Sequence, residues 1–203
     1  MIISLGIKQY HVDLTTIIFC ACQVLWDNRF LGDTGNKALV TLDGTDLEVQ
    51  MKFAEKFLSH KFKGNGVKYE VGVAIQTGYI VWIHGPARCG INDITLARQA
   101  FVSFLNDGEM ANADNGYLGE DALLKTPHLY HYLSEEQMAE AGTSRARHET
   151  INGRFKVFEV LTKSFRHSLA KHSSCFRAVA VITQLNIENG QPLFQVAYQD
   201  EGS

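Results

Sequence analysis

The chain has 203 residues, enough for one domain with a sizeable hydrophobic core but too few for two comfortable ones. Hydrophobic residues make up 45% of it and only three prolines occur, which excludes a disordered chain. The formal net charge is −3, and no apolar run reaches the roughly 18–20 residues of a membrane helix, so we expect a soluble intracellular protein.

Charge is unevenly spread along the chain. Residues 145–177 hold eight Lys or Arg and two Glu, a balance of +6, and the remainder carries −9. A basic C-terminal third beside an acidic body is a possible footprint for phosphate. A solvated helix face would have the same composition, so charge alone does not decide between the two.

Residues 1–37 are weakly patterned, although 13–30 could form a helix. The short apolar run 38–42 predicts a strand buried on both faces, with a break at Gly44. Alternation over 47–53 predicts a second extended piece. The four cysteines show no zinc-binding spacing and are expected to be buried free thiols; they are Cys20, Cys22, Cys89 and Cys175.

Residues 67–76 alternate between apolar and polar or small side chains, and 79–86 is apolar throughout, so the two predict a hairpin in a sheet. The period then becomes helical over 91–108, with Asn92 or Asp93 near the start.

Residues 109–114 predict a short strand followed by a turn. Ser134 and Gln137 form a capping-box pattern for a short helix that ends at Gly142. A long helix is expected to start at Thr143 or Ser144, and a last helix over 175–190, where AVAVI could also be a strand. This order of elements predicts an α/β fold with a mixed sheet and helices packed against it.

Three acids fall at expected element boundaries. Asp43 ends the first strand, Asp114 ends the short strand, and Glu149 lies near the start of the long helix. Two carboxylates about 4 Å apart repel by about 4 kcal/mol at an effective dielectric near 20, so their convergence requires a cation. Oxygen ligands alone favour Mg²⁺ or Mn²⁺, and two such ions serve phosphoryl transfer. The alternative is that DGTD (43–46) is a simple turn.

Several blocks in order carry a family resemblance: DGTD, HKFKGNGVKYEVGVAIQTGYIVWIHGP, GINDITLAR, ADNGYLG and RHETINGRFKVFEVLTKSFRH. Together, from about Leu39 to Phe165, they resemble the DDE-superfamily endonuclease domain of Harbinger-type transposases and their domesticated relatives. The resemblance implies a ribonuclease H-like mixed sheet flanked by helices and metal-dependent cutting and joining of DNA. It implies that Asp43, Asp114 and Glu149 are the catalytic metal ligands for Mg²⁺ or Mn²⁺.

The same resemblance suggests further site residues. Asp93 matches the acid of a Gly-x-x-His-Asp block in which Asn92 replaces the His, and Asp46 replaces a His that often follows Asp-Gly-Thr. We expect these two as accessory acids, although Asp46 could merely cap the turn. Contacts to DNA phosphate are expected from four residues: Lys61, Arg147, Asn152 and Lys156.

The expected organisation is an N-terminal segment, residues 1–37, and a DDE endonuclease domain, residues 38–203. The first is too short and too little basic for a helix-turn-helix unit with its linker, so it reads as a remnant of, or linker to, a DNA-binding region. The expected partner is DNA, with a separate DNA-binding protein supplying target selection. The resemblance implies the nucleus, although no Lys/Arg-rich run supplies an import signal.

Two other functions remain open at this stage. A domesticated module could keep the fold without catalysis and use its basic helix to bind DNA or a protein. A metal phosphohydrolase acting on small substrates is the more remote alternative.

Overall fold

The computed structural model describes residues 2–5, 8–11, 24–30, 38–51, 54–128 and 134–195. Most of the predicted helix 13–30, and both Cys20 and Cys22, lie outside these residues. Of that predicted helix, the described part forms only a 3₁₀ turn, η1 (Trp26–Arg29).

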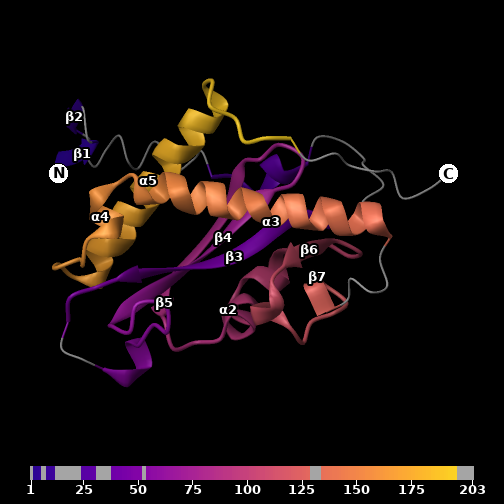
Figure 1. Cartoon of the computed structure of the whole chain (residues 1–203), viewed down its shortest axis with the longest axis horizontal. Coiled ribbons are helices and arrows are strands. Elements are labelled where there is room, and N and C mark those ends of the chain that lie inside the picture. The colour runs from indigo at the N-terminus through magenta and orange to yellow at the C-terminus, as the bar shows by residue number, and fades with distance from the viewer. Residues whose placement is uncertain are drawn as a thin grey trace.

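The core of the fold is a five-stranded mixed sheet in the order β5-β4-β3-β6-β7 (Figure 1). Strands β3 (Ala38–Glu48), β4 (Gly66–Ala74) and β5 (Ile80–Arg88) are antiparallel neighbours. Strands β6 (Met110–Ala113) and β7 (Leu124–Lys125) add in parallel on the other side of β3. The predicted hairpin and the predicted mixed sheet are therefore confirmed. A separate pair, β1 (Ile2–Leu5) and β2 (Lys8–His11), is antiparallel.

The predicted break at Gly44 is wrong, because β3 continues through it. Asp43 pairs with Val71 of β4 and Gly44 pairs with Glu70, so both lie inside the strand. Pairing along β4 keeps this stretch extended although β6 stops accompanying it after Leu42. Asp43 is thus held by a strand on one side and is not at a strand end.

Helix α2 (Asp93–Gln99) is shorter than the predicted helix over 91–108. It gives way to the 3₁₀ turn η3 (Phe101–Phe104), in which Phe101 is fully buried and packs edge-on against Trp26 and Trp82. This aromatic cluster explains why the chain leaves the α-helical path at Ala100.

Helix α3 (Glu135–Lys156) is one continuous helix, so the predicted end at Gly142 is wrong. A glycine inside a helix costs about 1 kcal/mol relative to alanine, which neighbouring turns can outweigh. The two other C-terminal helices are α4 (Glu159–Thr162) and α5 (Leu169–Glu188), and AVAVI lies in α5 as helix. Two more 3₁₀ turns are η2 (Glu55–Phe57) and η4 (Asn115–Tyr117).

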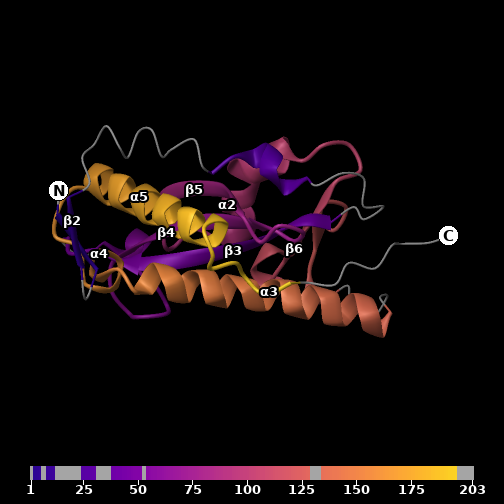
Figure 2. The same cartoon turned by 90° about the horizontal axis from the view of Figure 1, so that it is seen from above.

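Helices cover both faces of the sheet (Figures 1 and 2). On one face α3 and α5 bury a core that includes Ile151, Phe155 and Phe176. On the other face α2, η1 and η3 pack over a second core around Phe101 and Tyr117. Trp26 of η1 packs against this second core.

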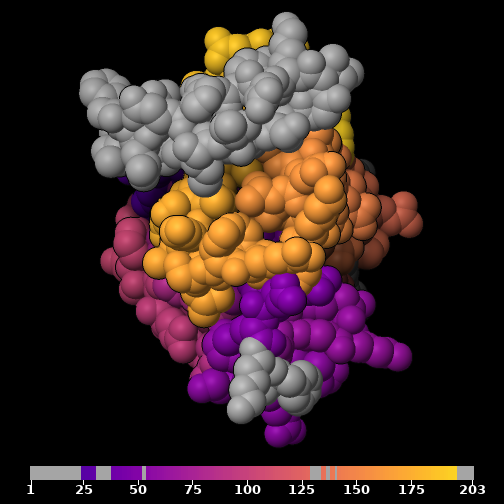
Figure 3. Space-filling view, turned by 90° about the vertical axis from the view of Figure 1, so that its left-hand side faces the viewer, coloured from indigo at the N-terminus to yellow at the C-terminus, as the bar shows by residue number. Residues whose placement is uncertain are grey.

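The far end of β3 is closed by the chain after α4. Val49 bridges Phe165 in parallel, and the amide of Gln50 donates to the Phe165 carbonyl at 2.7 Å. Figure 3 views this end of the molecule, where the orange C-terminal segment lies against the purple β3–β4 region. Cys89 and Cys175 are buried, as expected. In the part of the chain that the structure describes, no helix has the length and apolar character to traverse a lipid bilayer.

One buried acid is unusual. Glu70 on β4 is fully buried and accepts a hydrogen bond from Trp82 Nε1 at 3.0 Å. Burial is the main reason that its pKa rises from 4.5 to about 7, against the opposing effect of the Trp82 bond. The folded state therefore holds this proton more tightly than the unfolded chain does. The contribution of Glu70 to stability falls as pH rises from about 4.5 to about 7.

We predict that Glu70→Gln, which keeps an acceptor for Trp82, raises the free energy of unfolding by about 2–3 kcal/mol at pH 8. The gain should shrink towards zero near pH 4.5, where the unfolded-state carboxyl takes up its proton. Urea denaturation across this pH range measures the difference. Glu48→Gln, at an exposed end of β3, is the matched control and should change little. A pH-independent difference would contradict the assignment.

Candidate active site

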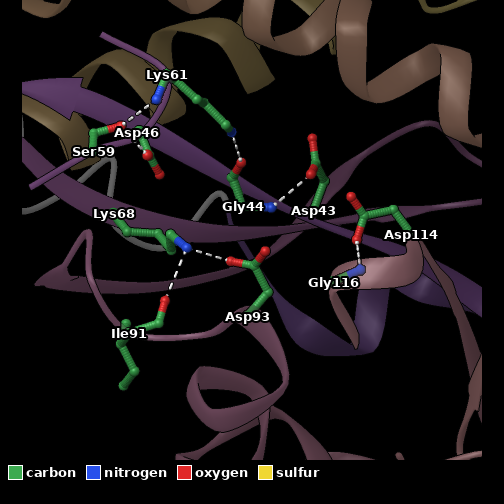
Figure 4. Close-up of polar contacts among 10 residues, drawn as sticks. All are labelled: Asp43, Gly44, Asp46, Ser59, Lys61, Lys68, Ile91, Asp93, Asp114 and Gly116. Carbon is green, nitrogen blue, oxygen red and sulfur yellow. Dashed lines mark hydrogen bonds and ion pairs between the residues drawn. The ribbon is translucent and has the colours of Figure 1, made fainter. Parts of the chain in front are cut away.

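The sheet register brings the first two acids together. Strands β3 and β6 pair in parallel with Thr41 opposite Asn112 and Leu42 opposite Ala113. The next residue of each chain is Asp43 and Asp114, so the register places them on neighbouring strands, where backbones lie about 4.8 Å apart. Figure 4 shows their side chains next to each other. Two residues 71 positions apart in the sequence thus become neighbours through one register.

Helix α3 brings the third acid to the same place. Glu149 is exposed on the turn of α3 that passes this end of the sheet, and it lines a cavity of about 380 Å³ together with Asp43 and Asp114. The remaining lining residues come from β3 and from successive turns of α3: Leu42, Gly142, Arg145, Ala146 and His148. The predicted acids therefore line one cavity from three separate elements.

Backbone amides orient the two aspartates. The amide of Gly44 donates to Asp43 Oδ1 at 2.7 Å, and the amide of Gly116 donates to Asp114 Oδ1 at 2.8 Å (Figure 4). Within the described residues Asp114 Oδ2 accepts no hydrogen bond, and Asp43 Oδ2 has Asn152 Nδ2 at 3.3 Å. Each carboxylate is thus held through one oxygen by a glycine amide, and only the second oxygen of Asp43 has a further partner among the described residues.

The surroundings of the cavity disfavour the charged forms of Asp114 and His148. The pKa of Asp114 is raised, mainly by desolvation and then by the neighbouring charges of Asp43 and Asp93, against the opposing Gly116 bond. Burial lowers the pKa of His148, although Asp43, Asp114 and the Thr41 backbone favour its charged form. The imidazole is therefore neutral near pH 7, and the acids lack a protonated histidine as counter-charge.

The donor set suits a hard divalent cation in its chemistry, because the three converging acids offer only oxygen ligands. The charges of Asp43 and Asp93 add to the effect of burial in raising the pKa of Asp114, and a nearby cation would oppose all three. Among the described residues, however, no group of three or more His, Cys, Asp or Glu side chains stands arranged to hold a metal ion. Side-chain rotation, above all of exposed Glu149, would be needed to complete a ligand set.

The expected phosphate contacts differ in where they lie. Lys61 is exposed, and its Nζ donates to the carbonyl of Gly44 at 3.2 Å, beside Asp43 (Figure 4). Lys156 is exposed two turns after Glu149. Both remain available to an anion, whereas Asn152 bonds to Asp43 and so joins α3 to β3.

Arg147 is not available for DNA, and its assignment as a phosphate contact is wrong. The residue is 1% exposed, and its guanidinium donates to the carbonyls of Ala74, Ile75 and Phe194. Arg147 occupies the buried side of α3, so it ties this helix to the β4–β5 turn and to the chain after α5.

The two accessory acids do not line the cavity. Asp46 lies three residues after Asp43 on one strand, so its side chain points to the opposite face of the sheet. There it accepts a hydrogen bond from Ser59 Oγ at 2.5 Å, so it is neither a turn cap nor part of the trio. Asp93 is also on that face, in an ion pair with Lys68.

Sequence reasoning missed Arg145 and the glycine one turn before it. Gly142, Arg145, Ala146 and Glu149 are spaced i, i+3, i+4 and i+7, which is one face of a helix, and all four line the cavity. Counting back from Glu149 in steps of three and four residues would have identified these positions. The predicted helix end at Gly142 prevented this. Arg145 places a positive charge in an otherwise acidic cavity.

Comparisons of the chain with protein-family models, with curated proteins and with solved structures found no match.

We predict that Arg147→Met lowers the free energy of unfolding by about 2–4 kcal/mol, because it leaves buried carbonyls without their donor. Lys156→Met, on the exposed side of the same helix, should change stability by less than about 0.5 kcal/mol. Urea denaturation compares the two. If Arg147→Met were as stable as the wild type but bound DNA more weakly, Arg147 would again be assigned as a phosphate contact.

Proposed function

We propose that this chain is a DDE-type endonuclease domain, related to Harbinger transposases, which cleaves DNA phosphodiesters at the cavity of Asp43, Asp114 and Glu149. The supporting observation is that these three acids, far apart in the sequence, line one cavity. A mixed sheet with helices on both faces is compatible with the ribonuclease H-like fold that this proposal requires.

In this proposal Asp43, Asp114 and Glu149 hold Mg²⁺ or Mn²⁺. The bound ions would activate a water and stabilise the leaving oxygen of the phosphodiester. Asp43 and Asp114 are the fixed members, since each has one oxygen held by a glycine amide. Glu149, exposed on α3, adjusts to complete the ligands and accepts a proton from the attacking water.

Positive groups around the cavity suit a phosphodiester. Arg145 lines the cavity, and Lys61 lies at the β3 carbonyl next to Asp43. Cations one or two turns from the acids position a phosphate without reading sequence. The basic stretch 145–177 extends this surface along the C-terminal helices, and a freed 3′ hydroxyl could then attack a second DNA in strand transfer.

We predict that the purified chain nicks supercoiled plasmid in Mg²⁺ or Mn²⁺, and that Asp43→Asn lowers the rate about hundredfold or more. The matched control is Asp27→Asn, at a fully exposed acid that does not line the cavity. Gel analysis of nicked product measures both. Equal rates for wild type and Asp43→Asn would rule out catalysis at this cavity. Hydrolysis of a nitrophenyl phosphate ester without DNA dependence would favour the small-substrate phosphohydrolase.

We predict that Mn²⁺ binds the wild-type chain and that Asp114→Asn weakens binding at least about tenfold, measured by calorimetry. Because the pKa of Asp114 is raised, protons compete with the ion at a higher pH than they would at an ordinary aspartate, and affinity falls as pH drops through that pKa. Failure to bind Mn²⁺ together with retained DNA binding would favour the non-catalytic module.

A further inference from the structure

One carboxylate contacts the backbone beside both site aspartates from the opposite face of β3. A Cβ built on Gly44 would meet Asp93 Oδ1 at 3.0 Å, and one built on Gly116 would meet Asp93 Oδ2 at 2.6 Å. The two oxygens of Asp93 therefore occupy the space where side chains at Gly44 and Gly116 would lie. Neither glycine leaves room for a side chain unless Asp93 moves (Figure 4).

Lys68 fixes the position of Asp93. Its Nζ lies 2.5 Å from Asp93 Oδ1 and donates to the Ile91 carbonyl at 3.0 Å. Lys68 is 7% exposed on β4, opposite Asp46 of β3, so its ammonium is screened from water. Charge-assisted hydrogen bonds of this kind are among the strongest that side chains form. The pair ties the start of α2 to the centre of the sheet.

The two glycines in contact with Asp93 are the same two whose amides hold the site aspartates. Gly44 donates to Asp43 Oδ1, and Gly116 donates to Asp114 Oδ1. A displacement of Asp93 would therefore open space beside both glycines whose amides hold the site carboxylates. Asp93 itself does not line the cavity and is neutralised by Lys68, so it is not placed as a third aspartate ligand.

We propose that Lys68 and Asp93 form a positioning pair that sets the distance between the carboxylates of Asp43 and Asp114. The catalytic consequence rests on the proposed function, because the pair touches neither substrate nor cavity. The geometric consequence, that Asp93 immobilises the amides of Gly44 and Gly116, stands without it.

The test compares Asp93→Ala with Glu120→Gln. Glu120 is the matched control because it also pairs with a cation, Arg98 of α2, and its side chain is 30% exposed against 26% for Asp93. Two measurements are made on each variant: hydrogen exchange of the Gly44 and Gly116 amides by NMR, and the dissociation constant for Mn²⁺. Amides within α5 serve as the internal reference for global stability.

Asp93→Ala should speed exchange at both glycine amides about tenfold, with α5 unchanged, and weaken Mn²⁺ binding about tenfold. Lys68→Met should shift both measurements in the same direction, and Glu120→Gln neither. Gly44→Ala should weaken Mn²⁺ binding in the wild type and add nothing in Asp93→Ala, because the clash partner is gone. A role of Asp93 in stability alone would not make the effect of Gly44→Ala on Mn²⁺ binding depend on Asp93.

Unchanged exchange at both glycine amides in Asp93→Ala would overturn the positioning pair. Asp93→Asn, which removes charge and keeps shape, carries the same comparison if the alanine variant does not fold. Should the wild type bind no Mn²⁺, the proposed function fails, while the exchange measurement still decides the positioning pair. Should Mn²⁺ bind equally to wild type and Asp93→Ala despite faster exchange, the pair does not set the carboxylate distance.

Discussion

The structure depends on how strand β3 is paired. It pairs with β4 from Val40 to Glu48 but with β6 only as far as Leu42 and Ala113. The end of β6 leaves Asp43 held on one side and open on the other, with Asp114 immediately beyond the last parallel pair. A slip of one residue in this register would turn Asp43 to the opposite face of the sheet. The cavity therefore depends on this register.

Charge is separated by the thickness of one strand. On one face of β3 lie the cavity acids with Arg145, and on the other lie Asp93, Lys68 and the buried acid Glu70. Gly44 lies between the two groups. It has no side chain, so Asp93 occupies the space that a side chain would fill. Burial is the main cause of the raised pKa values of Asp114 and Glu70, and the charge of Asp93 adds to both.

Helix α3 combines structural and site roles on different sides. Ile151 and Phe155 are buried in the core against the sheet, and Arg147 satisfies carbonyls at the β4–β5 turn. Glu149 and Arg145 line the cavity from the next face. Because apolar packing anchors the helix so close to the site, the placement of Glu149 follows from the core. Gly142, inside the helix, lines the cavity without a side chain.

Local pattern in the sequence was enough for the β4–β5 hairpin, the short strand before Asp114, the apolar steps of α3 and the three acids. These rest on periodicity and turn residues, which neighbouring residues specify. The local pattern placed element ends wrongly at Gly44 and Gly142, because glycine is typical of breaks. In the structure Gly44 is kept extended by its strand partner, and Gly142 is kept helical by the neighbouring turns. It also could not separate Arg147 from an exposed arginine, or Asp46 and Asp93 from cavity acids.

What the sequence by itself determined is most of the longer strands and helices and the identity of the acids available to a site. Which acids share a cavity was decided by tertiary structure alone, because it depends on the register between β3 and β6 and on the face of the sheet that each side chain takes. Both are long-range properties, because β4, β5 and α2 lie between Asp43 and Asp114 in the chain.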